Sequence, residues 1–289
     1  MALIRKILSR RRLLAVLGVP LILFGVMMLF PYPRQSLFGP TIRGKPWCEW
    51  EDAIRSNHAE RGDGPLADVM MFLRRFVFPE PEQMADAELF DHPEMLPLVI
   101  ALLDDPSPSV RGACIFAIEI YPNIQDASAV PALTKRFEDD VLKNRLEAGI
   151  ALWRVNKDRR IVPVCTDLLK NGNADERFAA TNSVSRLGAD FPELFPHVAA
   201  HAKDANPLIR QNVMYAMDQF GSKGVPILVT GLKDANAGVR HTAVAGLYSL
   251  GPVAKDAAPA LEACFGDADS YVAGVARAAL RRIDPKRVD

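Results

Sequence analysis

The stretch VPILVTGLKDANAGVRHTAVAGLYSLG, residues 225–251, contains the pattern that decides the fold. A Pro stands at its second position, an Asp follows eight residues after that Pro, and an Arg follows fourteen residues after it. The pattern recurs from six prolines that lie 34, 32, 33, 30 and 33 residues apart: Pro97, Pro131, Pro163, Pro196, Pro226 and Pro259. Repeats of this length are typical of solenoids.

The acidic and basic markers stay in register with these prolines. Eight residues after each Pro stand Asp105, Asp139, Asn171, Asp204, Asp234 and Asp267. Fourteen residues after each stand Arg111, Arg145, Arg177, Arg210 and Arg240, with Ala273 in the last repeat. Because a catalytic pair has no reason to recur in every repeat, we interpret these markers as structural, forming polar links between adjacent repeats.

Each repeat is expected to contain two helices. Pro suits the first turn of the first helix, where its fixed φ and missing amide hydrogen are tolerated. Residues that can cap the second helix follow two positions after the acidic marker: Ser107, Asn173, Asn206, Asn236 and Asp269, with Val141 as the exception. Apolar residues then recur on one face of the second helix, as Ile209, Val213, Ala216, Met217 and Phe220 illustrate. Glycines that tolerate a left-handed conformation are expected to end three of these helices: Gly188, Gly221 and Gly251.

Two segments, LPLVIALLDDPSPSVRGACIFAIEIYP at residues 96–122 and the stretch at residues 225–251, resemble HEAT repeats. They are similar to the short form found in phycobilisome-lyase-like proteins. The resemblance extends from residue 96 to residue 289 and implies an all-α fold, a right-handed α-solenoid of about six two-helix repeats. It also implies that the second helices line the concave side of the solenoid.

An apolar segment precedes the repeats. Residues 13–30 contain no charged side chain, and a helix of this length spans about 27 Å, close to the hydrocarbon thickness of a bilayer. This predicts a transmembrane helix. Five cations lie within residues 1–12, so we expect this basic tail to stay in the cytoplasm and the solenoid to lie in a periplasmic or lumenal space. A cleaved signal peptide and an inverted anchor with a cytoplasmic solenoid are the alternatives.

Two further segments connect the membrane helix to the repeats. Residues 31–45 are rich in Pro, Gly and cations, which predicts an extended tether. Residues 46–95 are expected to form a helical cap, because a solenoid needs its end covered. Within this cap we predict helices at residues 46–61 and 66–78 and a short helical turn at residues 84–90.

The charge balance argues against nucleic acid as a partner. Eight of the 35 cations lie in residues 1–45 and none of the 35 acids does, so the remaining chain has 27 cations against 35 acids. A nucleic-acid binder needs a basic stripe instead.

Searches for catalytic and cofactor motifs give little. The sequence lacks the spacing of metalloproteases, nucleotide-binding loops and hydrolase nucleophile elbows. His92 and Glu94 match half of a zinc deaminase motif, but its two cysteines are missing. Cys114, Cys165 and Cys264 occupy apolar positions, which predicts buried free thiols. We therefore predict a protein that is not an enzyme and has no cofactor or metal site.

One surface feature points to binding. Positions 15, 19 and 22 after each Pro lie opposite the apolar face of the second helix, and they carry Phe116, Trp153, Phe178, Tyr215 and Tyr248. Four cations flank these aromatic residues: Arg154, Arg186, Arg281 and Arg282. Exposed aromatic side chains are typical of recognition surfaces, which predicts a partner groove. The alternative is that some of these rings fill gaps between neighbouring repeats.

Together these features predict a membrane-anchored, non-catalytic scaffold that holds a protein partner. An enzyme or enzyme subunit is the first alternative, because the phycobilisome-lyase-like proteins that the repeats resemble include lyases that attach a bilin to a cysteine of a light-harvesting protein. The second alternative is an architectural component of an envelope complex.

Overall fold

The computed structural model describes residues 41–42, 45–58, 90 and 92–287. The chain divides into two units, residues 1–129 and 130–289. Several predicted features lie outside the described residues: the basic tail, the transmembrane helix, the tether as far as residue 40, the cap helix at 66–78 and most of the turn at 84–90. Within the described ranges, no helix combines the length and the apolar character that crossing a membrane requires.

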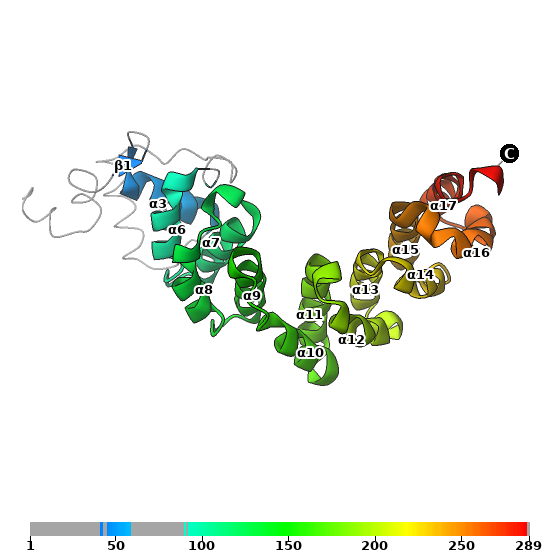
Figure 1. The fold of residues 1–289 in the computed structure, drawn as a ribbon, viewed down its shortest axis with the longest axis horizontal. Helices are drawn as coiled ribbons and strands as arrows, with labels where there is room; N and C mark the ends of the chain where they lie inside the picture. Colours follow the sequence, from blue (N-terminus) through cyan, green and yellow to red (C-terminus); the bar gives the residue numbers. More distant parts are fainter. Residues whose placement is uncertain (1–40, 43–44, 59–89, 91, 288–289) are drawn as a thin grey trace, which may run out of the picture. The chain divides into compact units, whose positions relative to one another are not determined.

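A cap helix and one helix pair dominate the described part of the first unit (Figure 1). Its elements are α3 (Trp47–His58), η1 (Pro93–Met95), α6 (Leu96–Leu102), α7 (Pro108–Ile120), η2 (Pro122–Ile124) and η3 (Ala127–Ala129). The cap helix α3 packs on both α6 and α7. It buries Ala53 and Ile54 in the apolar interior.

Two short strands precede α3. They are β1 (Thr41–Ile42) and β2 (Lys45–Pro46), and they pair antiparallel. The indole Nε1 of Trp50 donates to the carbonyl of Ile42 at 3.0 Å, and both residues are buried. The sequence predicts an extended tether up to residue 45, and the structure shows that Thr41–Ile42 and Lys45–Pro46 form paired strands at the end of this segment. The amino-acid composition of the segment does not predict this pairing. It cannot show that the buried indole N–H of Trp50 donates to a carbonyl group within the segment.

Successive helix pairs form the second unit (Figure 1). The first helices are α8 (Val130–Arg136), α10 (Ile161–Asn171), α12 (Phe195–Ala199), α14 (Val225–Gly231) and α16 (Ala258–Ala263). The second helices are α9 (Leu142–Asn156), α11 (Ala174–Leu187), α13 (Pro207–Gln219), α15 (Ala237–Leu250) and α17 (Ser270–Ile283). Short 3₁₀ turns lie between or after several of these helices: η4 (Gly188–Asp190), η5 (Pro192–Leu194), η6 (Ala200–Lys203), η7 (Gly221–Lys223), η8 (Gly251–Ala257), η9 (Cys264–Gly266) and η10 (Pro285–Arg287). The all-helical repeat fold predicted from the sequence is confirmed.

Helices begin largely as the sequence predicts. Pro is the second residue of α6, α8, α12, α14 and α16, and it leaves no amide unpaired there. The expected cap residues accept from the amides that open α11, α13, α15 and α17: Asn173, Asn206, Asn236 and Asp269. The prediction for Ser107 is wrong, because its side chain forms no cap bond. The amide of Ser107 instead donates to Asp105 Oδ1 at 2.8 Å, and this bond holds the turn before α7.

Glycines end three second helices with positive φ. Gly188 follows α11 with a φ of 37°, and Gly251 follows α15 with a φ of 56°. Their ψ values, −113° and −134°, lie outside the predicted left-handed helical region. Side chains rarely adopt this conformation. At Gly188, an added Cβ would also lie 2.3 Å from the Cβ of Gln219, so the chain can turn here only with glycine.

Arginine and aspartate side chains link successive repeats of the second unit. The guanidinium of Arg210 donates to both carboxylate oxygens of Asp234, at 2.7 and 2.8 Å. Arg240 makes the same two bonds to Asp267, both at 2.8 Å. Each pair joins the second helix of one repeat to the loop that follows the first helix of the next repeat.

Each of these arginines also closes a loop in its own repeat. Nη1 of Arg210 donates to the carbonyl of Asp204 at 2.8 Å, and Nη1 of Arg240 donates to the carbonyl of Asp234 at 3.0 Å. The carboxylate of Asp234 also accepts from the amide of Asn236 at 2.8 Å. The side chains of Arg210 and Asp234 are only 15% and 12% exposed, so water competes weakly for these bonds. One pair therefore fixes two loops and the spacing between two repeats.

The cap helix supplies an equivalent cation in the first unit. Arg111 closes its own loop by donating to the carbonyl of Asp105 at 3.0 Å. The carboxylate of Asp105, which is fully buried, forms an ion pair with Arg55 of α3. The cap thus takes the place that the arginine of a preceding repeat takes in the second unit.

We predict that Arg240→Ala lowers the free energy of unfolding by about 1–3 kcal/mol at neutral pH, because it breaks a shielded charged pair. Arg240 lowers the pKa of Asp267 below its ordinary value of 3.8 by donating to its carboxylate. The pair therefore stabilises the fold fully above about pH 4, and the contribution is lost as the pH falls through the lowered pKa.

Chemical denaturation between pH 7 and pH 2 measures both effects. The variant should lose less stability than the wild type on acidification, because Asp267 then has a more ordinary pKa. Lys233→Ala removes the same charge from an exposed position and should change the stability by less than about 0.5 kcal/mol. Parallel acid profiles for wild type and Arg240→Ala would contradict the prediction.

Candidate binding surface

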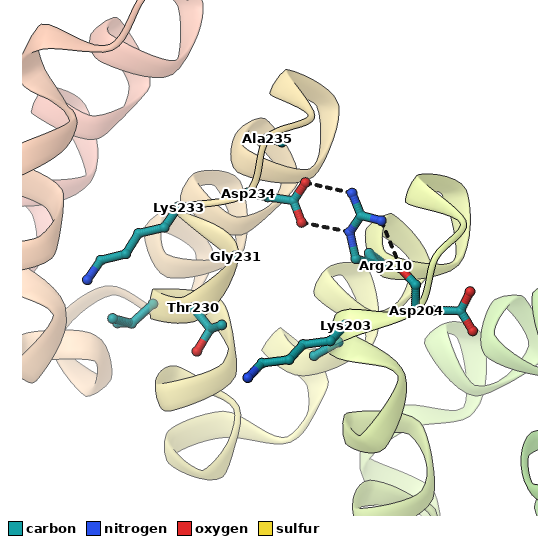
Figure 2. A pocket seen from close by; sticks show the side chains of 10 residues that line it. Lys203, Asp204, Arg210, Thr230, Gly231, Lys233, Asp234 and Ala235 are labelled. Carbon is teal, nitrogen blue, oxygen red and sulfur yellow. Dashed lines mark hydrogen bonds and ion pairs between the residues drawn. The ribbon is translucent and has the colours of Figure 1, made fainter.

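A hollow of about 560 Å³ lies where two successive repeats of the second unit meet. Figure 2 shows the Arg210–Asp234 pair on one side of it and the side chains of Lys203 and Lys233 directed away from that pair. The carboxylate of Asp204 points away from Arg210 in this view, and it accepts from Arg177 at 2.8 Å.

The charged groups of the hollow are mostly committed to holding the repeats together. Arg210 donates to Asp234 and to the carbonyl of Asp204, so its donors are used within the fold. The donation from Arg210 lowers the pKa of Asp234 below its ordinary value, and the two side chains form an ion pair. Two exposed lysines remain at the rim. We therefore assign the hollow to packing between repeats rather than to ligand binding.

The second helices of the second unit leave one side open to solvent. Helices α9, α11, α13, α15 and α17 pack against one another in this order. Positions 12, 15, 19 and 22 after each Pro lie on one side of a helix, because their spacing alternates between three and four residues. We call these positions of α11, α13, α15 and α17 the second-helix face. Its aromatic and large apolar side chains are Phe178, Leu208, Tyr215, His241, Tyr248 and Tyr271.

Three predicted aromatic residues lie on this face as exposed side chains. Phe178 is 37% exposed, Tyr215 is 53% exposed and Tyr248 is 39% exposed. They come from α11, α13 and α15, which are neighbours in the row of second helices. Phe116, also exposed, lies on α7 of the first unit.

Trp153 differs from the other predicted aromatic residues. Its indole Nε1 donates to Asp190 at 2.8 Å, and its ring centroid lies 4.7 Å from that of the buried Phe191. The amino group of Lys157 lies 4.8 Å from its ring centroid. The ring thus packs α9 against the segment after α11, which fits the gap-filling alternative for this residue.

The flanking arginines also separate into two groups. Arg154 donates to the carbonyl of Arg186 at 3.2 Å, and Arg186 lies 3.8 Å from Glu147. These two side chains hold α9 to α11. Arg281 and Arg282 are instead exposed at the end of α17, and the guanidinium of Arg282 lies 4.8 Å from the ring centroid of Tyr248.

Two residues of the second-helix face escape the sequence prediction. Tyr271 is 59% exposed, and its ring meets that of His241 edge-on with centroids 4.2 Å apart. Tyr271 stands at position 12, about one helical turn before position 15, where the predicted pattern of aromatic residues begins. His241 stands at position 15 of α15. Including position 12 in the pattern would have found Tyr271, and also Leu208.

Buried thiols in this chain are unsuited to chemistry at neutral pH. Burial raises the pKa of Cys165 to about 12, and it raises the pKa of Cys114 further. Both thiols stay protonated and are poor nucleophiles and metal ligands. In the part of the chain that the structure describes, no group of three or more His, Cys, Asp or Glu side chains is placed to hold a metal ion.

Two stretches of the chain match known families. Residues 195–281 match the family described as HEAT repeats, and residues 95–120 match the family described as HEAT repeat. Both stretches are thus similar to HEAT repeats. They contain the second-helix face from Leu208 to Tyr271 and the helix pair of the first unit. No curated protein matches the chain.

Solved structures with similarity to these HEAT-like repeats include engineered and natural proteins. An engineered protein is 16% identical with a TM-score of 0.45, covering 66% of this chain and 96% of its own. Computationally designed armadillo repeat proteins for modular peptide recognition are 17% identical with a TM-score of 0.41, covering 65% and 100%. Human deoxyhypusine hydroxylase in complex with glycerol is 20% identical with a TM-score of 0.36, covering 82% and 97%.

We predict that Trp153→Ala and Tyr215→Ala have different effects on stability. Trp153→Ala should lower the free energy of unfolding by about 2–4 kcal/mol, because it removes the ring packing against Phe191 and the hydrogen bond of the indole to Asp190. Tyr215→Ala should lower it by less than about 1 kcal/mol, because the ring is largely in water already. Denaturant titration of both variants checks this. Equal losses would mean that Tyr215 is also a packing residue.

Proposed function

We propose that this protein is a non-catalytic scaffold that binds a protein partner through the second-helix face. The observation that carries the proposal is one exposed aromatic ring on each of four adjacent helices: Phe178, Tyr215, Tyr248 and Tyr271. Single exposed rings are common on protein surfaces, but a contiguous row of them is typical of an interaction site. Aromatic residues are enriched in the cores of protein interfaces.

The fold prepares these rings for binding. Each stands on a helix whose opposite side is fixed in one core cluster, and Arg–Asp pairs between repeats hold the spacing of the helices. Phe and Tyr have only two rotatable side-chain bonds, so ordering them on binding costs little entropy. A long row of such contacts suits a peptide segment or helix of a partner, which is how solenoids generally use an extended surface.

The proposal includes membrane anchoring through residues 13–30, with the repeats in a periplasmic or lumenal space. Its support is the uncharged sequence of that segment and the five cations that precede it. We expect the full chain to stay in the membrane pellet after extraction at alkaline pH. A chain without residues 1–45 should move to the supernatant, and recovery of both forms in the supernatant would refute the anchor.

We also propose that the repeats are of the short type found in phycobilisome-lyase-like proteins. We further propose that this chain has no lyase activity. Such lyases attach the bilin to a cysteine of a light-harvesting protein, so the test of this alternative looks at the acceptor and not at the buried thiols of this chain, such as Cys114 and Cys165. We expect purified protein incubated with a bilin and a phycobiliprotein to leave that acceptor without bound chromophore. A chromophore attached to the acceptor would place the chain among the enzymes.

We predict that proximity labelling from a tag after Asp289 marks a recurrent set of neighbours that depends on the second-helix face. Tyr215→Ala combined with Tyr248→Ala should reduce labelling of these neighbours at least about five-fold, because it removes central aromatic contacts. Val253→Ala is the matched control, because Val253 is 56% exposed but lies on η8, outside this face.

The labelling shows whether the partner binds at the exposed aromatic rings of the second-helix face or elsewhere. Neighbours lost with the tyrosines and kept with Val253→Ala support the proposed function. Neighbours that persist in the tyrosine variant would show that the partner binds elsewhere, and the proposed binding surface would be wrong.

A further inference from the structure

The surface formed by α15 and α17 carries cations and aromatic rings but no acid. Neither helix contains an Asp or Glu within residues 237–250 or 270–283. Arg281 and Arg282 are exposed near the end of α17. Neither arginine forms an ion pair with a carboxylate in the part of the chain that the structure describes.

Other arginines of the same region are engaged within the fold. Arg240 is bonded to Asp267, and Arg277 donates to the carbonyl of Phe265 at 3.0 Å. Arg287 pairs with Glu262 at 3.1 Å. A position near the end of a helix favours cations in general, but it does not explain why Arg282 lies across Tyr248 of the neighbouring helix.

The guanidinium of Arg282 lies over an aromatic ring in a position where it can bind a carboxylate. Its Cζ lies 4.8 Å from the ring centroid of Tyr248, and a Cβ added at Gly251 would lie 3.4 Å from its Nε. Stacking on an aromatic ring covers the face of the guanidinium and leaves its N–H edge to donate. Two parallel N–H groups match the two oxygens of a carboxylate.

An open apolar strip lies beside these cations. Between Tyr271 and Arg281 on α17, the second-helix face carries only Gly274 and Ala278, both exposed. A Cβ added at Gly274 would meet nothing within 4 Å, so no side chain covers this part of the helix. Tyr271 with His241 stands at one end of the strip, and Tyr248 with Arg282 stands at the other end.

We propose that the α15–α17 surface binds an acidic segment of the partner in which carboxylate and apolar side chains alternate. The carboxylates would pair with Arg281 and Arg282, and the apolar side chains would lie on the strip between Tyr271 and Tyr248. The choice of an acidic occupant follows from charge complementarity, because this surface offers two guanidinium groups and no carboxylate. The inference rests on the proposed function and names the chemistry of its partner.

Fluorescence anisotropy with two labelled peptides tests this inference on the full-length chain in a non-ionic detergent. One capped octapeptide alternates glutamate with leucine, and the other alternates lysine with leucine. The acidic peptide should bind at least about ten-fold more tightly than the basic one. Its affinity should also fall as salt is raised, because exposed charge pairs are screened.

Two double variants, each of which removes two positive charges, show where the acidic peptide binds. Arg281→Gln with Arg282→Gln should weaken the acidic peptide at least about ten-fold, because it removes both guanidinium groups. Lys170→Gln with Lys255→Gln removes two exposed cations from α10 and η8, and it should leave the affinity within about two-fold.

Equal affinity for both peptides, or an equal effect of both variant pairs, would overturn the acidic-segment proposal. The proposed function would still stand if proximity labelling continued to depend on Tyr215 and Tyr248. Both proposals fail if the peptides bind without preference and the labelling does not depend on those tyrosines.

Discussion

The bidentate bond between an arginine of one repeat and an aspartate of the next is the constraint on which the second unit depends. A pair of short helices cannot bury its apolar face alone, so each repeat is stable only when a neighbour covers it. Apolar packing supplies most of the driving force but is not directional. The Arg210–Asp234 and Arg240–Asp267 pairs add direction, because a guanidinium and a carboxylate meet in one plane and at one distance.

The same bonds explain why the second-helix face is free for binding. Links between repeats use the loops at the start of the second helices, and packing uses their buried sides. The remaining side makes few contributions to the fold and can carry exposed rings without loss of stability. Trp153 shows the opposite case, because its indole bonds to Asp190 and its ring packs on Phe191. An aromatic residue at one of the predicted positions can thus either pack within the fold or stay exposed, depending on the residues around it.

Sequence reasoning predicts the repeated helix pairs well, because their signals are local. Pro in the first turn, a capping Asn and a terminal Gly each act within a few residues. Asn173 and Asn206 cap their helices as predicted, and Gly188 ends its helix with a positive φ but with a ψ outside the predicted left-handed region. Spacing predicts which residues share a face, and Phe178, Tyr215 and Tyr248 are exposed together. The superhelical hand, the number of repeats and the membrane anchor stay predictions.

The errors arise where a distant partner decides the outcome. Trp153 is drawn into packing by Asp190, which lies 37 residues away. Thr41 and Ile42 join the first unit through the indole of Trp50. A single sequence shows the periodicity but not these distant contacts. It therefore predicts that a surface exists, and the structure is needed to show which residues form it.

A double-mutant cycle on Arg210 and Asp234 tests the central claim most directly. The free energy of unfolding would be measured for the wild type, Arg210→Ala, Asp234→Ala and the double variant. The account predicts a coupling energy of about 1–3 kcal/mol between the two side chains, because they are shielded and doubly bonded. A coupling energy below about 0.3 kcal/mol would contradict it, since the two side chains would then act independently and apolar packing alone would set the spacing of the repeats.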